Sequence, residues 1–158
     1  MNARILIVDA NDNLRMTMAR VLKLKGHEVQ TTSENDHAID LALKVGKFDL
    51  IFMNVQQPLK VAIEAYETLR NILTGSVVFM MTSFEIEKQL REQFRDGQYN
   101  IISTPDSNGL PLAVDELVDE AILGSTLTCL HKPLDMLQVF SIIDGVLTKR
   151  KEVSDWIS

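Results

Sequence analysis

The stretch Ile5-Leu6-Ile7-Val8-Asp9 decides the fold, because four consecutive aliphatic residues end at a carboxylate. A short apolar run without polar alternation is typical of a strand buried on both faces, as in a parallel sheet. Similar runs recur at 48–53, 77–81 and 127–130, with a weaker one at 27–31. Segments with apolar residues at helical spacing separate these runs, so the sequence predicts five strands that alternate with helices.

An alternation of this kind predicts an α/β fold, in which a doubly wound parallel sheet carries helices on both faces. Function in such sheets sits at the carboxyl ends of the strands. The polar residues at or just beyond those ends are Asp9, Asn54, Thr82 and Lys132. We therefore expect the functional site at this edge of the sheet.

The segment between the fourth and fifth predicted strands is too long for one crossover. Residues 84–111 contain a charged helix with a solvated face (85–95), a strand-like run (99–103) and a turn-rich stretch. We interpret them as an insertion between strand 4 and strand 5. The chain has 158 residues, which predicts one domain over 1–148 and a C-terminal tail over 149–158.

The composition is that of an ordinary globular protein, with 46% hydrophobic and 24% charged residues. The formal net charge of -6 argues against non-specific nucleic-acid binding, which needs a basic surface. The first apolar run is too short for a signal peptide or a membrane span, so we expect a cytoplasmic protein without membrane association. Cys129 is the single cysteine, and no Cys/His cluster in the sequence indicates a metal site.

Together these motifs resemble the receiver domain of response regulators, the signalling proteins of two-component and phosphorelay systems. The resemblance rests on the order and spacing of Ile5–Asp9, Phe48–Asn54 with Pro58, Met81-Thr82 and Leu130–Leu134. It implies a flavodoxin-like (βα)5 fold with five parallel strands in the order 2-1-3-4-5.

Receivers accept a phosphoryl group on an aspartate at the end of the third strand, and an acidic pair after the first strand helps to hold Mg²⁺. By this resemblance the acceptor position is Asn54, and the acidic pair is reduced to Asp9-Ala10, with Asp12 as a substitute one helical turn on. A carboxamide is a poorer nucleophile than a carboxylate, and Mg²⁺ requires anionic oxygen ligands. The resemblance is therefore to a degenerate pseudo-receiver. We expect no catalytic residue and no cofactor, and at most weak metal binding through Asp9.

The resemblance also places Thr82 and Lys132 where receivers contact the phosphoryl oxygens, and Cys129 where they carry a switch aromatic residue. Lys132 either keeps a functional role or forms a salt bridge with Asp9. Asp9 in turn either serves as a cation ligand, caps the following helix or pairs with Lys132. Thr82 either takes part in a switch or satisfies a backbone amide. We expect Cys129 in the core and His131 at the surface.

Two functions remain open on this basis. The first is an interaction module that works without phosphorylation. It binds a histidine kinase, an output domain, another receiver or a second copy through the fourth helix, the fifth strand and the fifth helix. The alternative is an atypical phosphorelay receiver that is phosphorylated at Asp9 or Asp12, or that binds an anion at Thr82 and Lys132. We expect no enzyme, because the acidic turn 9–13 lacks the glycines of a nucleotide-binding loop.

Overall fold

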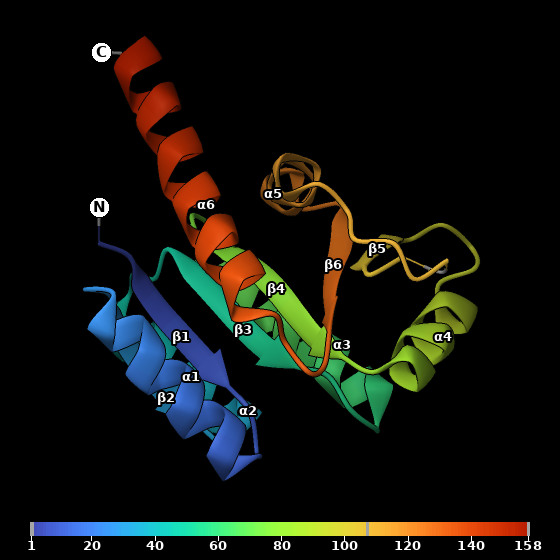
Figure 1. The fold of residues 1–158 in the computed structure, drawn as a ribbon. Helices are drawn as coiled ribbons and strands as arrows, with labels where there is room; N and C mark the ends of the chain where they lie inside the picture. Colours follow the sequence, from blue (N-terminus) through green and yellow to red (C-terminus); the bar gives the residue numbers. More distant parts are fainter. Residues whose placement is uncertain (1, 107, 158) are drawn as a thin grey trace.

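A six-stranded parallel β-sheet forms the centre of the computed structural model, which describes residues 2–106 and 108–157 (Figure 1). The strands lie in the order β2-β1-β3-β4-β6-β5, and each neighbouring pair is parallel. Their bounds are β1 (Arg4–Val8), β2 (Glu28–Thr32), β3 (Leu50–Asn54), β4 (Val77–Thr82), β5 (Asn100–Thr104) and β6 (Thr126–His131). The alternating sequence pattern thus produces the doubly wound α/β fold that it predicts.

Helices of the described part of the chain cover both faces of the sheet. The face turned toward the viewer in Figure 1 is covered by α1 (Asp12–Leu24), α5 (Val114–Leu123) and α6 (Met136–Ile157). The opposite face is covered by α2 (Asn35–Val45), α3 (Leu59–Ile72) and α4 (Phe84–Gln93). Within the described residues, none of these helices combines the length and apolar character that a membrane span needs.

The central strands are buried on both sides, which explains why their sequences lack polar alternation. Ile5 and Ile7 lie in the core under α1, α5 and α6, whereas Leu6 lies in the core under α2, α3 and α4. All three side chains have no exposed surface. Burying one such side chain contributes roughly 2 kcal/mol to folding. A polar residue at any of these positions would therefore destabilise one of the two cores.

The structure has one strand more than the sequence predicts. The run interpreted as part of an insertion forms β5, which pairs with the outer edge of β6 from Asn100 beside Thr126 to Thr104 beside Leu130. The predicted order is confirmed for β2-β1-β3-β4-β6, but the count of five strands is wrong because β5 extends the same sheet. The chain passes outward to β5 through α4 and returns to β6 through α5 on the opposite face. Right-handed connections require this change of face when the chain reverses direction.

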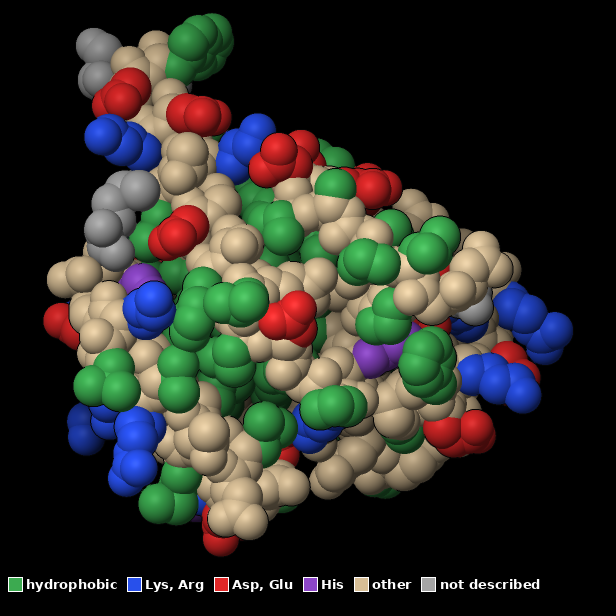
Figure 2. Space-filling model, in the orientation of Figure 1, with side chains coloured by type: hydrophobic (Ala, Val, Ile, Leu, Met, Phe, Trp, Pro, Cys, Tyr) green, Lys and Arg blue, Asp and Glu red, His purple; other side chains and the backbone are tan. Residues whose placement is uncertain are grey.

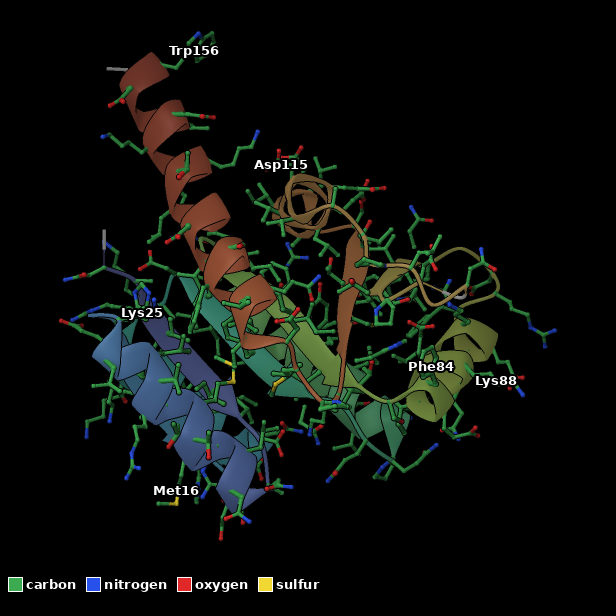
Figure 3. All side chains as sticks on the ribbon, viewed as in Figure 1. Met16, Lys25, Phe84, Lys88, Asp115 and Trp156 are labelled. Carbon is green, nitrogen blue, oxygen red and sulfur yellow. The ribbon has the colours of Figure 1, made fainter. Side chains whose placement is uncertain are left out.

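The last helix continues across residue 148, at which the sequence predicts the end of the domain. α6 runs to Ile157 without interruption. Arg150 Nη1 donates a hydrogen bond to Asp49 Oδ1 at 2.6 Å, so the helix remains attached to the domain at this point. Trp156 lies at the far end of α6, away from the sheet, and its side chain is exposed (Figure 3).

We predict that one histidine makes stability depend on pH. The N–H of buried Ala3 donates to His27 Nδ1 at 3.0 Å, which requires this nitrogen to be unprotonated. Burial lowers the pKa of His27 below its ordinary value of 6.5, although the Asp144 carboxylate opposes the effect. The unfolded chain therefore binds this proton more readily than the folded chain. The stabilisation is complete above pH 6.5 and decreases as the pH falls toward the lowered pKa.

Urea unfolding between roughly pH 7.5 and roughly pH 5 measures this effect, which we expect to be about 1 kcal/mol, the usual contribution of one hydrogen bond. The variant His27→Gln keeps an acceptor but cannot titrate, so its stability should fall less over the same range. Identical pH dependence in the two proteins would contradict the prediction.

Candidate functional site

The carboxyl ends of the central strands meet at one edge of the sheet, where the structure collects the predicted site residues. Asp9 directly follows β1, Asn54 ends β3, and Thr82 ends β4. Lys132 directly follows β6. Because all strands are parallel, this edge brings together residues that are as many as 123 positions apart.

An ion pair between Asp9 and Lys132 joins the loops after β1 and β6. Lys132 Nζ lies 2.6 Å from Asp9 Oδ2, and the Asp9 side chain is 2% exposed. The other carboxylate oxygen accepts a hydrogen bond from the backbone N–H of Asn11 at 2.8 Å. Both oxygens of Asp9 are therefore engaged within the protein. Of the two interpretations of Lys132, the structure shows the salt bridge.

The residues at this edge do not fit the Mg²⁺ ion that the receiver resemblance implies. The ion needs anionic oxygen ligands, usually one or two carboxylates. Asp9 is neutralised by Lys132, and Ala10 offers no ligand. Asp12 is exposed, and its carboxylate pairs with Arg15 at 2.7 Å. Among the described residues, no group of three His, Cys, Asp or Glu side chains could hold a metal ion.

Asn54 lines a polar hollow of about 350 Å³ together with Asp9, Ala10, Ser33 and Gln56. Its side-chain amide donates a hydrogen bond to Gln56 Oε1 at 3.2 Å. The position that the receiver resemblance assigns to the acceptor therefore carries a neutral amide, which is hydrogen-bonded to a second amide. This arrangement can form hydrogen bonds, but it contains no carboxylate nucleophile.

Thr82 and Cys129 both lie in the interior. The Thr82 carbonyl accepts a hydrogen bond from the backbone N–H of Lys132 at 2.8 Å, which continues the pairing of β4 with β6. Cys129 is fully buried in the core under α2, α3 and α4. Burial raises the pKa of its thiol to about 12, so the thiol stays neutral near pH 7. The expectation of a core cysteine is confirmed.

A buried polar pair that sequence reasoning misses connects β6 to α4. His131 Nε2 donates to Glu87 Oε1 at 2.9 Å, and the Phe84 ring packs on the imidazole with 4.1 Å between ring centroids. His131 is 7% exposed and Glu87 is 5% exposed. The sequence predicts His131 at the surface and Glu87 on the solvated face of the charged helix, and both predictions are wrong.

The physical reason is the sixth strand. β5 covers the outer edge of β6, and α4 packs across its carboxyl end, so His131 lies in the interior. The other oxygen of Glu87 contacts Arg91 Nε at 3.4 Å, within the same helix. Because His131 and Glu87 are 44 positions apart, no local pattern in the sequence indicates the pair.

The chain belongs to the response regulator receiver domain family, since the family model matches residues 5–115. The match includes β5 and ends at the start of α5, before β6 and Lys132. The resemblance based on the site motifs is thereby confirmed at the level of the family. Receivers are signalling modules that interact with proteins such as kinases and output domains.

Two curated relatives agree with this assignment. The chain is 26% identical over 132 residues to the regulatory protein AtoC of Escherichia coli (strain K12), which covers 83% of this chain and 28% of AtoC. It is 28% identical over 102 residues to a response regulator receiver protein of Anaeromyxobacter sp. (strain Fw109-5), which covers 65% of this chain and 42% of that protein. The chain thus spans less than half the length of each relative.

Solved structures show the same fold over nearly the whole chain. A CheY-like receiver domain protein from Methanospirillum hungatei JF-1 aligns with a TM-score of 0.64 and 16% identity, covering 96% of this chain and 98% of that one. A structure named adenylate cyclase, from Rhodopirellula baltica, aligns with a TM-score of 0.65 and 22% identity, covering 98% of each chain. At such identities the likeness concerns the fold alone.

We predict that Asp9 and Lys132 are strongly coupled in stability. The variant Lys132→Met leaves the buried Asp9 carboxylate without its partner. Removing one partner of a fully buried pair costs about 3–5 kcal/mol, and we expect about 2 kcal/mol because the Lys132 side chain is 29% exposed. The double variant Asp9→Asn with Lys132→Met should recover at least about 1 kcal/mol relative to the sum of the single effects. Urea unfolding of the four proteins measures the coupling, and additive effects would show that the pair is not coupled.

Proposed function

We propose that this receiver acts without phosphorylation, as a module that binds a protein partner. The observation that carries the proposal is the amide of Asn54 at the position where receivers carry the phosphoryl-accepting aspartate. Phosphoryl transfer needs a nucleophile positioned in line and cations that neutralise the phosphoryl oxygens. Asn54 lacks the carboxylate, and Ala10 removes half of the acidic pair that would hold Mg²⁺.

The ion pair at the same edge also supports the proposal, because it pairs the positive charge of Lys132 with Asp9. The Lys132 ammonium lies on Asp9 at 2.6 Å and is therefore not free for an incoming phosphoryl group. Ala10, which lines the same hollow as Asn54, offers no carboxylate that could help to hold a metal ion and so replace that positive charge. On this proposal the protein is a binding module, not an enzyme, and it needs no Mg²⁺ or other cofactor.

The sequence predicts that a partner binds the face formed by the fourth helix, the fifth strand and the fifth helix. We propose that the partner binds the part of this face that remains exposed. The middle strand of that face is β6, and all of its residues are buried because β5 covers its edge. The fourth helix remains exposed, and Phe84 in its first turn is 57% exposed (Figure 3). Its ring is already held against His131. A preordered aromatic side chain is a typical anchor of protein interfaces, because it loses little entropy on binding.

The partner that fits this proposal is a component of the same signalling system, namely a histidine kinase, an output domain or another receiver. The chain keeps the receiver fold but has no acceptor aspartate at Asn54. On this proposal a partner therefore recognises the surface of the domain and not a phosphoryl group. The chemical test of the acceptor position and the test of the surface are therefore separate.

The first test is the intact mass of the protein after incubation with acetyl phosphate and Mg²⁺. We expect no phosphoryl adduct on the wild type, because Asn54 offers no carboxylate. The double variant Asn54→Asp with Ala10→Asp restores the missing carboxylates and should gain one phosphoryl group, which controls for the integrity of the scaffold. A modified wild type would overturn the proposal. If the modification mapped to Asp9 or Asp12, the protein would be an atypical phosphorelay receiver.

The second test is the capture of partner proteins on the immobilised chain, with and without acetyl phosphate. We expect the same proteins in both conditions, and a loss of at least about tenfold for Phe84→Ala, since an aromatic anchor commonly contributes 2 kcal/mol or more. Trp156→Ala is the matched control, because Trp156 is also an exposed aromatic residue but lies at the far end of α6. Capture that requires the phosphodonor would contradict the proposal.

A further inference from the structure

We propose that copies of this chain associate head to tail, with α5 of one copy packed against α1 of the next. The two helices belong to different parts of the fold, since α5 is part of the extra strand–helix unit and α1 is in the first unit. The proposal concerns a surface on the other face of the sheet from α4, and it does not depend on the proposed function.

The α1 side of the contact is a groove of about 970 Å³ along α1 and the edge strand β2. The charged residues that line the groove are both basic, Arg20 and Lys23, and both are exposed. Neither forms an ion pair with any residue that the structure describes. Met16 and Leu24 line the same groove with 67% and 82% of their surface exposed. In a chain with a net charge of -6, this is a locally basic and apolar surface.

The α5 helix has the opposite chemistry. Every charged residue from Val114 to Leu123 is acidic. Its last turn exposes Ile122 and Leu123, by 43% and 71%. Acidic residues in a first turn stabilise a helix through its dipole, which accounts for Asp115 and Glu116 without any partner. The dipole does not account for the exposed aliphatic residues Ile122 and Leu123, which lie about two turns beyond these acids.

The basic residues along α1 and the acidic residues along α5 have matching spacings when the two helices run antiparallel. On α1, Met16, Arg20 and Lys23 are separated by four and then three residues, so they share one helix face. On α5, Glu116, Asp119 and Leu123 are separated by three and then four residues. Antiparallel packing therefore places Lys23 opposite Glu116, Arg20 opposite Asp119, and Met16 opposite Leu123.

Asp119 already has a partner within its own copy. Its Oδ1 lies 3.4 Å from Lys149 Nζ, and the two side chains are 56% and 41% exposed. Ion pairs with this exposure contribute little to stability, so Asp119 can also face a basic residue of a neighbouring copy at small cost.

The positions of the helices require two different copies. Figure 3 shows Met16 on α1 and Asp115 on α5 at opposite sides of the molecule, with α6 between them. Figure 2 shows basic side chains over α1 at the lower left and acidic ones over α5 at the upper middle of the view. A contact between two different surfaces of identical chains is heterologous, so each copy can bind one neighbour at α1 and another at α5.

Sedimentation velocity of the whole chain at increasing concentration tests the proposal. We expect the weight-average mass to rise with concentration at low salt and to fall when salt is added, because salt screens exposed charges. A wild type that remains monomeric at every concentration would overturn the proposal and leave a partner of different sequence as the occupant of the groove.

Charge-reversed variants identify the two surfaces. Arg20→Glu with Lys23→Glu, and separately Glu116→Lys with Asp119→Lys, should each weaken association at least about tenfold, because like charges then face each other. An equimolar mixture of the two variants should associate again, since each contact between unlike chains regains opposite charges. Lys88→Glu with Glu92→Lys on α4 is the matched control and should associate like the wild type.

Circular dichroism of each variant verifies that it is folded, so a loss of association cannot be attributed to unfolding. Two results would overturn the proposal: reversed variants that associate as the wild type does, or a mixture that fails to regain association. Association that Phe84→Ala abolishes while the reversed variants retain it would place the contact on α4 instead.

Discussion

The ion pair between Asp9 and Lys132 is the interaction on which the chemistry of this receiver depends. It joins the ends of the first and last strands across 123 positions of sequence, and it gives a carboxylate that is 2% exposed the positive charge that burial requires. The same contact occupies the lysine that, in receivers, serves the phosphoryl group. Among the described residues Lys132 forms no second ion pair, and the position that the resemblance assigns to the acceptor carries the neutral amide of Asn54.

The strand–helix unit formed by β5 and α5 extends the sheet beyond the five strands that the sequence predicts. Pairing of β5 with β6 moves the edge of the sheet outward by one strand, so that β6 becomes an interior strand. His131 at its end is then enclosed beside Glu87 of α4, and Phe84 is held against the imidazole. The unit also adds an acidic helix to the face that carries α1 and α6.

Basic and acidic residues gather on different helices of this chain, which the net charge of -6 does not reveal. At the carboxyl edge Lys132 neutralises the charge of Asp9, and Asn54 carries a neutral amide. Arg20 and Lys23 lie on α1 and form no ion pair with a described residue, whereas every charged residue of α5 is acidic. This difference in charge between α1 and α5 is the basis of the proposed contact between copies of the chain.

The sequence by itself determined the alternating α/β architecture and the identity of the residues at the carboxyl edge. These features follow from local apolar runs such as Ile5–Val8 and from the rule that parallel strands end at one edge. The order of the inner strands was implied by the resemblance to receivers and not by these local patterns. The sequence also indicated a strand near Ile101, and it placed Cys129 in the core correctly.

The tertiary structure alone decided which partner each polar residue has. Asp9 could bind a cation or Lys132, and only the assembly of β1, β3, β4 and β6 into one sheet brings the ammonium within 2.6 Å. The place of β5 at the sheet edge, and with it the burial of His131 and Glu87, depends on pairing and packing between distant segments. Local sequence patterns report which side of an element is apolar, whereas contacts across 44 or 123 positions arise only when the whole sheet has assembled.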